Sequence, residues 1–176
     1  MYIRETGDAD LNDILSVEGA AFDGGKEVEF TRDLLADPTA KPFLSLMAFI
    51  DGEPAGHILF TAARLMNSTV AVSFLAPLAV VPKFQRRGVG GALIKKGLEL
   101  LSKSGVDLVF VVGHPEYYPR YGFKVAGKLG FETPHPMPVE HADAWMARAL
   151  RLDLLGSVTG KVVCCDTLNK PELWQG

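Results

Sequence analysis

The chain has 176 residues, of which 22% are charged, and a formal net charge of -3 from 18 Lys and Arg against 21 Asp and Glu. This length favours one domain with a sizeable core, which excludes a disordered chain. Nucleic acid and anionic membranes are excluded as general partners because such binding needs a basic field. Any polyanionic ligand must therefore be held by groups placed locally.

The sequence lacks the features of secreted and membrane proteins. Met1–Glu5 has no basic segment followed by an apolar core, so we expect no secretory signal. The longest apolar stretch, Phe74–Val81, is far shorter than the ~20 residues of a membrane helix. Cys164 and Cys165 are adjacent, which suits neither a zinc site nor an ordinary disulfide. We therefore expect buried thiols in a cytoplasmic protein without a membrane span.

The first elements are a short alternating segment and two helices. Tyr2–Glu5 alternates, and the apolar spacing over Leu11–Val17 predicts a helix that Thr6 or Asp8 caps. A second helix is predicted over Glu27–Ala36, because helical apolar spacing ends there before a proline.

The pattern then changes to strands. Leu44–Ile50 and Ala55–Ala63 are apolar runs separated by the turn sequence of residues 51–54, which predicts an antiparallel hairpin. Thr69–Val81 is apolar on nearly every residue of its second half, as in a strand covered on both faces. Pro77 inside this strand predicts a bulge or an edge, since proline has no N–H for a sheet ladder.

The clearest helix is predicted over Gly88–Ser104, with Gly105 as a left-handed C-cap. The apolar strand Leu108–Val112 follows it. A strand, a helix and a buried strand in this order predict a parallel crossover. Thr69–Val81 and Leu108–Val112 should therefore be neighbours.

The remaining chain predicts a strand near Lys124–Glu132, a helix over His141–Ala149 and a final strand near Lys161–Thr167. Trp145 and Met146 are expected to pack from that helix into the core. The expected fold is a mixed α/β domain over residues 1–176, in which residues 133–176 are a variable C-terminal part. His135 and His141 have no further ligands at metal-site spacing, so no metal site is expected.

One segment carries the chemistry: a buried strand ends in the loop Gln85–Gly88, and the long helix begins there. The first turn of a helix offers unpaired N–H groups and the positive end of the helix dipole, and glycines let a ligand approach the backbone closely. This arrangement predicts a diphosphate site. The spacing fits neither the dinucleotide pattern GxGxxG, whose third position is Leu93, nor the P-loop pattern.

The string QRRGVG, Gln85 to Gly90, is similar to the Q/RxxGxG/A signature of the GCN5-related N-acetyltransferases. The preceding LAVVP resembles the end of the fourth strand of that family. Downstream, Tyr118-Pro119-Arg120-Tyr121-Gly122-Phe123 resembles its tyrosine segment. The similarity spans roughly Met1 to Glu132, and the complete set of motifs is far more specific than a lone QxxGxG.

The resemblance implies an α/β fold with a mixed sheet whose fourth and fifth strands splay apart, with acetyl-CoA as the cosubstrate between them. It implies that pantetheine pairs with the backbone of Leu78 to Val80 and that N–H groups from Arg86 to Gly91 hold the pyrophosphate. The cofactor-binding residues it assigns are Leu78, Ala79, Val80, Gln85, Arg86, Arg87, Gly88, Val89, Gly90 and Gly91.

The implied activity is direct attack of a primary amine on the thioester in a ternary complex, with Tyr118 as the acid that protonates the leaving thiolate. Members often carry a carboxylate on the fourth or fifth strand, but Leu108–Val112 is entirely apolar here, so the base is not identified. His114 stands where members often have an asparagine. His57 is interpreted as a bonded sheet histidine rather than a base, and Glu18 as a polar-face residue or part of the acceptor cleft.

The rival interpretation is a non-catalytic acyl-CoA-binding or regulatory module of the same fold, which the missing strand carboxylate favours. An enzyme that uses a longer acyl group is a third interpretation. The sequence leaves open whether the acceptor is a small amine, an amino acid or a protein. It also leaves open the oligomeric state, a homodimer included.

Overall fold

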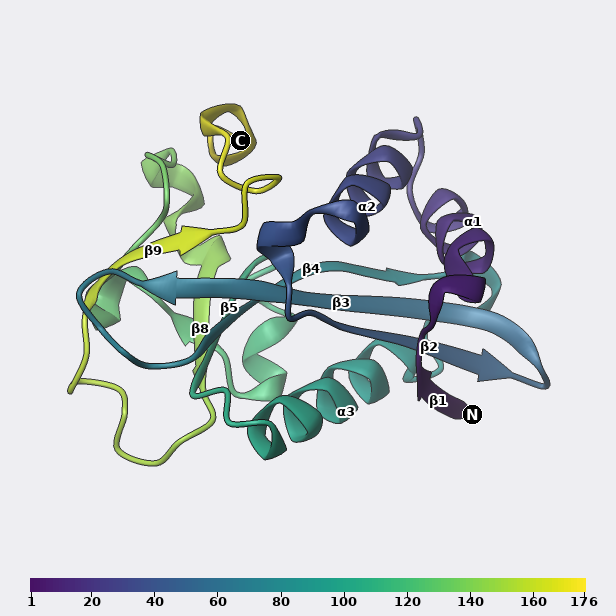
Figure 1. Ribbon diagram of the computed structural model, residues 1–176, viewed down its shortest axis with the longest axis horizontal. Helices are drawn as coiled ribbons and strands as arrows, with labels where there is room; N and C mark the ends of the chain where they lie inside the picture. Colours follow the sequence, from purple (N-terminus) through teal and green to yellow (C-terminus); the bar gives the residue numbers. More distant parts are fainter.

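A nine-stranded mixed sheet, in the main order β1-β2-β3-β4-β5-β8-β6, organises the computed structural model, which describes residues 1–176. Figure 1 shows α1 (Leu11–Ala21) and α2 (Lys26–Ala36) on one face of this sheet and α3 (Val89–Lys103) on the other. The strands are β1 (Tyr2–Glu5), β2 (Leu44–Ile50), β3 (Glu53–Leu65), β4 (Val72–Val80), β5 (Leu108–Val112), β6 (Lys124–Val125), β7 (Phe131–Glu132), β8 (Trp145–Ala149) and β9 (Gly160–Cys164).

The hairpin of β2 and β3 forms where the sequence predicts it. Asp51 and Gly52 connect the strands, with positive φ angles of 51° and 78°. Two consecutive left-handed residues fit the twist of an antiparallel pair, which explains the Asp-Gly sequence. The hairpin puts Met47 opposite His57, so side chains at these positions share a face of the sheet.

The parallel crossover is also confirmed. α3 connects β4 to β5, and the two strands pair in parallel from Val72–Leu108 to Leu75–Val111. Gly88, with φ of 80°, precedes the helix. Gly105, with φ of 94°, ends it, and the Val106 N–H donates to the Leu101 carbonyl at 3.0 Å.

A bulge in β4 decides what happens beyond this pairing. The register against β3 shifts between Ile58, opposite Leu78, and Phe60, opposite Leu75. Ala76 and Pro77 therefore oppose one residue of β3, and the bulge expected at Pro77 is confirmed. Because β4 has no pairing with β5 after Leu75, its C-terminal half leaves an opening in the sheet.

The C-terminal part differs from the sequence-based expectation. The helix predicted over His141–Ala149 is wrong: a 3-10 turn covers Val139–Ala144, and β8 follows. β8 pairs antiparallel with β5 along its whole length, which satisfies the ladder that β5 would otherwise expose. The strand expected near Lys124–Glu132 is two short strands with a 3-10 turn between them, while the final strand is confirmed as β9, which pairs with β3.

The start of α1 corrects a second prediction. Neither Thr6 nor Asp8 caps a helix; instead the Asp10 carboxylate accepts the Gly7 N–H at 2.7 Å, and a 3-10 turn over Asp8–Asp10 leads into the helix. Arg4 donates to both oxygens of Asp10 at 2.8 Å, which fixes the corner between β1 and α1.

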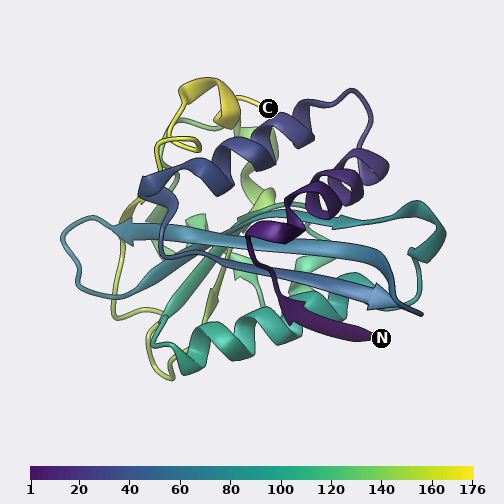
Figure 2. The same cartoon turned by 45° about the vertical axis from the view of Figure 1, so that its right-hand side comes forward.

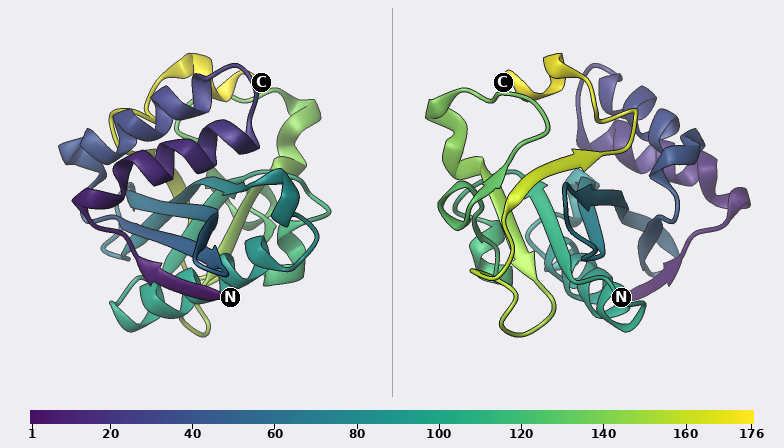
Figure 3. Two further views of the ribbon diagram at one scale, coloured as in Figure 1. Left: turned by 90° about the vertical axis from the view of Figure 1, so that its right-hand side faces the viewer. Right: turned by 60° about the vertical axis from the view of Figure 1, so that its left-hand side comes forward.

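The C-terminal segment lies on the same side of the sheet as α1 and α2, and the N-terminus lies at the edge of the sheet, where β1 begins (Figures 2 and 3). Two buried apolar clusters fill the faces: one contains Leu59, Phe110 and Trp145 under α2, and the other contains Phe60, Leu93 and Val109 under α3. Cys164 and Cys165 are free and buried, as expected. None of the helices combines the length and apolar character that crossing a bilayer requires.

Candidate active site

A cleft of about 640 Å³ lies where β4 and β5 separate. The end of β4, the loop before α3, the first turn of α3 and the segment after β5 line it, and the end of α1 closes it from the other face of the sheet. The lining residues are Ala21, Phe22, Leu78, Val80, Gln85, Arg86, Gly88, Val89, Gly90, Gly91, His114, Tyr117, Tyr118, Arg120 and Tyr121.

The first turn of α3 gives the cleft free hydrogen-bond donors. The first intrahelical bond runs from the Ala92 N–H to the Gly88 carbonyl, so the N–H groups of Val89, Gly90 and Gly91 have no acceptor within the helix. No side chain caps this end. These donors and the helix dipole favour an anionic group at this position, which is where the sequence predicts a diphosphate site.

Two arginines bring positive charge to the cleft. Arg86 is held in a left-handed conformation with φ of 65°, and Arg120 stacks over the Tyr117 ring at 5.9 Å. Arg87 does not line the cleft; its guanidinium lies over the Phe84 ring at 5.7 Å. The two adjacent arginines of the motif therefore occupy different environments.

Gln85 connects the loop before α3 to β4 through a side-chain hydrogen bond. Its side-chain amide donates to the Val80 carbonyl at 3.1 Å. This bond joins the loop to the last residue of β4 and keeps the glycines of α3 beside the opening in the sheet.

Three tyrosines form the wall opposite α3. Tyr117 contacts both Tyr118 and Tyr121 edge-on, at ring-centroid distances of 5.1 and 5.4 Å. A Cβ at Gly90 would lie 2.6 Å from the Tyr117 hydroxyl, and a Cβ at Gly91 would collide with Tyr121. Glycine is required at both positions because the aromatic wall packs directly on the helix.

Tyr118 has its ring in the core and is only 8% exposed. The ring packs edge-on against Phe123 at 5.5 Å, and its position leaves no room for a side chain at Gly113. Burial raises the pKa of Tyr118 to about 12, because the ionised phenol would lose its hydration. The hydroxyl therefore keeps its proton throughout the physiological range.

A polar cluster lies behind the end of α1, on the face of the sheet that α1 covers. The Glu18 carboxylate and the His57 ring are both fully buried, and His57 Nδ1 is 2.8 Å from Glu18 Oε2. His57 Nε2 is 2.9 Å from the Ser45 hydroxyl, which accepts the Thr6 hydroxyl at 2.8 Å. The interpretation of His57 as a bonded sheet histidine is confirmed, whereas Glu18 is not a solvated polar-face residue.

The cleft collects most of the residues that the sequence motifs assign, but not all of them. Ala79 faces away from it, into a small cluster with Met47 and Ile14, and Arg87 also lies outside the lining. The sequence analysis assigned no role at the site to Ala21, Phe22, Tyr117, Arg120 or Tyr121, which also line the cleft. Arg120 lies inside the tyrosine motif and Tyr117 directly precedes it, so both could have been found from that proximity, whereas Phe22 has no local signal.

No group of three or more His, Cys, Asp or Glu side chains is arranged to hold a metal ion. His135 does not line the cleft, and its Nε2 is 2.7 Å from the Asn169 side-chain oxygen. The donors of the cleft are backbone N–H groups, guanidinium groups and phenols, which suit phosphates rather than a cation.

The family model described as the acetyltransferase (GNAT) family matches residues 11–123, a range that includes every residue lining the cleft. The chain is 44% identical to YjhQ of Escherichia coli, described as an uncharacterized N-acetyltransferase, over 92% of this chain and 90% of the relative.

Two solved structures share the fold along nearly the whole chain. YhbS of Escherichia coli, a GNAT family N-acetyltransferase in complex with CoA, has a TM-score of 0.87 at 27% identity and covers 96% of this chain and 92% of its own. A GNAT family acetyltransferase from Brucella melitensis in complex with acetyl-CoA has a TM-score of 0.74 at 27% identity, over 95% and 97% of the two chains.

Proposed function

The chain belongs to the acetyltransferase (GNAT) family, and we propose that it transfers the acetyl group of acetyl-CoA to a primary amine. The observation that carries the proposal is the cleft at the β4 opening, with uncapped N–H donors on one side and the Tyr118 hydroxyl on the other. The relatives YhbS and the Brucella protein, which contain CoA and acetyl-CoA, support the same cosubstrate for this chain.

The proposed cosubstrate contacts follow the cleft from end to end. The N–H groups from Arg86 to Gly91 and the Arg86 guanidinium bind the pyrophosphate, and pantetheine pairs with the backbone of Leu78 to Val80, which β5 leaves free. Ala79 takes part only through its backbone. Arg87 lies outside the cleft lining and contacts only the outer end of the bound pyrophosphate. Arg120 adds a second guanidinium to the cleft.

In the proposed reaction the amine nitrogen attacks the thioester carbonyl carbon, so a C–N bond forms and the C–S bond breaks. The nitrogen loses a proton, and the departing thiolate gains one from Tyr118. A free thiol has a pKa of about 8.5, below that of Tyr118, so full transfer to a released thiolate is uphill; the hydroxyl acts by donating a hydrogen bond to the sulfur as negative charge develops on it, and the proton passes while the C–S bond breaks. Tyr118 then regains a proton from solvent through the cleft.

A non-catalytic acyl-CoA-binding module is the second candidate, favoured by the absence of any carboxylate on β5. The two candidates predict the same binding but different turnover. Purified protein is titrated with acetyl-CoA in a calorimeter and then incubated with a panel of amines, amino acids and peptides while free thiol is measured. Binding with acceptor-dependent thiol release supports the enzyme, binding without release supports the module, and no binding contradicts both.

The finer parts of the proposal concern where and with what the enzyme acts. Two buried free thiols support action in the cytoplasm, where thiols stay reduced. Acceptor classes are separated by the amine panel, and acyl length by comparing acetyl-CoA with longer acyl-CoA esters. A homodimer is tested by light scattering in solution.

A further inference from the structure

The structure contains a carboxylate that the motifs of the cleft do not account for. Glu18 projects from α1 into the interior and is fully buried, yet only one of its two oxygens is bonded: Oε2 meets His57, while Oε1 has no hydrogen-bond partner. A buried carboxylate without its full set of bonds is costly, so an unused oxygen is a feature that needs a reason.

The bonds around His57 fix the orientation of its ring. Thr6 donates its hydroxyl hydrogen to Ser45, so the Ser45 hydrogen is free to point at His57 Nε2. Nε2 then acts as an acceptor, and the ring hydrogen lies on Nδ1, where it is donated to Glu18 Oε2. In this arrangement the hydroxyl groups orient the ring so that Nδ1 serves Oε2 and leaves Oε1 free.

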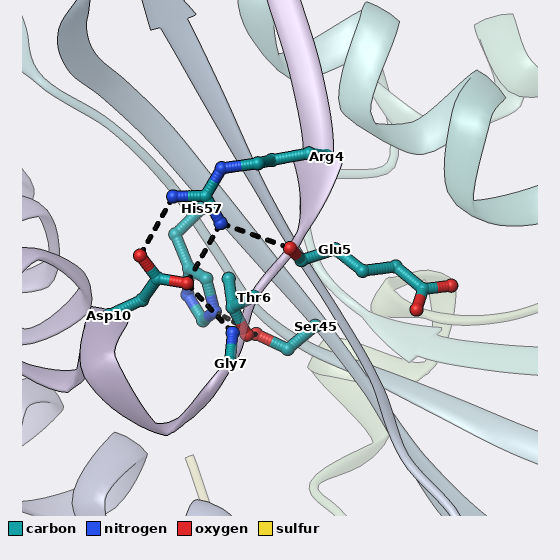
Figure 4. Close-up of polar contacts among 7 residues, drawn as sticks. All are labelled: Arg4, Glu5, Thr6, Gly7, Asp10, Ser45 and His57. Carbon is teal, nitrogen blue, oxygen red and sulfur yellow. Dashed lines mark hydrogen bonds and ion pairs between the residues drawn. The ribbon is translucent and has the colours of Figure 1, made fainter.

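The series of hydrogen bonds from Thr6 to Glu18 begins near the protein surface. Figure 4 shows Arg4 donating two hydrogen bonds to Asp10 beside Thr6 and Ser45, with the His57 ring behind them. The Asp10 carboxylate also accepts the Gly7 N–H, so both residues that follow β1 are fixed. This corner positions the Thr6 hydroxyl and therefore the whole chain of bonds that ends at Glu18.

The pair lies on the α1 face of the sheet, which Ala79 also faces. His57 is opposite Ala79 in the β3–β4 ladder, and the residues on either side of Ala79, Leu78 and Val80, line the cleft. Glu18 is one helical turn before Ala21 and Phe22, which line the cleft from the face of the sheet opposite α3. The inference places the acceptor amine on this face, because the other lining residues belong to β4, the first turn of α3 with its preceding loop, and the tyrosine segment.

The charged groups that face Glu18 set its readiness to accept a proton. Desolvation raises the pKa of Glu18, His57 from β3 opposes this effect, and Glu27 from α2 adds to it. Glu27 also carries a buried oxygen, Oε2, without a hydrogen-bond partner. A carboxylate whose pKa is raised from its ordinary value is a better proton acceptor near neutral pH than an exposed one.

We propose that Glu18 Oε1 accepts, through a water molecule in the cleft, the proton that the acceptor amine loses, and that His57, Ser45 and Thr6 are its positioning residues. The inference rests on the proposed acetyl transfer. One proton leaves the amine nitrogen as the C–N bond forms and binds the carboxylate, which later releases it to solvent through the cleft. No other bond to Glu18 forms or breaks.

The first test is Glu18→Gln, which keeps the shape and offers a carbonyl oxygen to His57 but has no oxygen that takes up a proton. The expected result is a fall in kcat of about 100-fold, the lower end for a lost general base, with the Kd for CoA unchanged within twofold. In the wild type, kcat rises with pH as Glu18 loses its proton, and this acid limb is absent in the variant. A variant with wild-type kcat and an intact acid limb overturns the inference.

The second test breaks the chain of hydrogen bonds farther from Glu18, and it remains informative if Glu18→Gln fails to fold. Ser45→Ala removes the hydroxyl that orients the His57 ring and is expected to shift the acid limb and to lower kcat about 10-fold. Thr61→Val is the matched control, because Thr61 is on β3, the strand that carries His57, is fully buried and has a hydroxyl without a partner. Equal pH profiles for Ser45→Ala and the wild type contradict the inference.

The wild-type measurement separates the two levels of proposal. If the wild type binds acetyl-CoA but transfers no acetyl group, the proposed function fails and the role of Glu18 fails with it. If the wild type transfers acetyl groups and Glu18→Gln does so equally well, only the role of Glu18 fails.

Discussion

At the residue scale, Tyr118 joins a buried ring to a hydroxyl at the cleft. Tyr117 and Phe123 pack edge-on against the ring, so its position is fixed by the core rather than by a hydrogen bond. The same burial raises the pKa of Tyr118 to about 12, which keeps the acid protonated at any pH at which the protein is assayed. The hydroxyl is therefore always present as a hydrogen-bond donor to the departing sulfur, although the raised pKa makes it a weaker acid than a free phenol.

Replacing Tyr118 with phenylalanine keeps the packing and removes only the hydroxyl. We expect kcat to fall about 100-fold, which is the scale of a lost general acid, while the CoA Kd stays within twofold. Steady-state kinetics and calorimetry measure the two quantities. Unchanged kcat would show that solvent protonates the thiolate and that Tyr118 is a packing residue.

Arg86 and Arg87 are neighbours in sequence with different surroundings, which makes them a matched pair. Arg86 lines the cleft, whereas Arg87 lies over Phe84 outside it. We expect Arg86→Ala to weaken CoA binding about 10-fold, the value of one charge-assisted hydrogen bond, and Arg87→Ala to weaken it less than threefold. Calorimetry at two salt concentrations measures both, and equal losses would assign the two guanidinium groups equal roles.

At the element scale, the close approach of α3 to the sheet depends on a glycine. A Cβ at Gly97 would overlap the Phe60 ring, which is fully buried and has no space to move into. Since α3 also carries the N–H donors of the cleft, its distance from β3 affects stability and binding together.

Gly97→Ala is therefore expected to lower the free energy of unfolding by about 2 kcal/mol through overpacking, even though alanine has the better helix propensity. Gly19→Ala in α1 is the control, because its Cβ would meet only a methyl group of Val28, at 3.3 Å. Urea unfolding measures both variants. A Gly97→Ala protein as stable as the wild type would mean that α3 moves away without cost.

At the scale of the whole molecule, Asp37 ties the C-terminal segment to the connection between α2 and β2. One of its oxygens accepts the Thr39 N–H and hydroxyl, and the other accepts the Thr167 N–H and hydroxyl, at 2.6 to 2.9 Å. These four donors hold the pKa of Asp37 well below its ordinary range, although burial acts in the opposite direction. A single charged side chain thus joins segments 130 residues apart.

Asp37→Asn places an amide nitrogen against two donors in either orientation, so we expect a loss of about 2 kcal/mol in the free energy of unfolding at pH 7. Because the folded-state pKa is lowered, the stabilisation by Asp37 is complete above about pH 4, the ordinary aspartate value, and falls as the pH drops below it. The difference between wild type and variant should narrow in the same range.

Thermal or urea unfolding at a series of pH values measures this difference. Asp33→Asn, at an exposed position of α2, is the control and should leave the stability unchanged at every pH. A difference between wild type and Asp37→Asn that stays constant from pH 7 to pH 3 would show that the Asp37 charge contributes nothing.

Local signals determined most of the elements. The Asp51-Gly52 turn, the glycines at both ends of α3 and the proline in β4 each impose one backbone geometry, so the hairpin, the crossover and the bulge could be predicted from neighbouring residues alone. The family followed from motifs of the same local kind, and the model match and the YjhQ relative confirm it.

Contacts between residues far apart in the sequence decided the features that local signals do not encode. The sequence by itself determined the α/β fold, the family and the glycine-lined first turn of α3, because short-range backbone preferences encode these features. Only the tertiary structure decided that residues 145–149 form a strand, since β5 supplies the ladder that overrides their helical spacing. It alone brought Glu18 to His57, 39 residues away, because a buried carboxylate is recognisable only when the elements that exclude water from it are assembled.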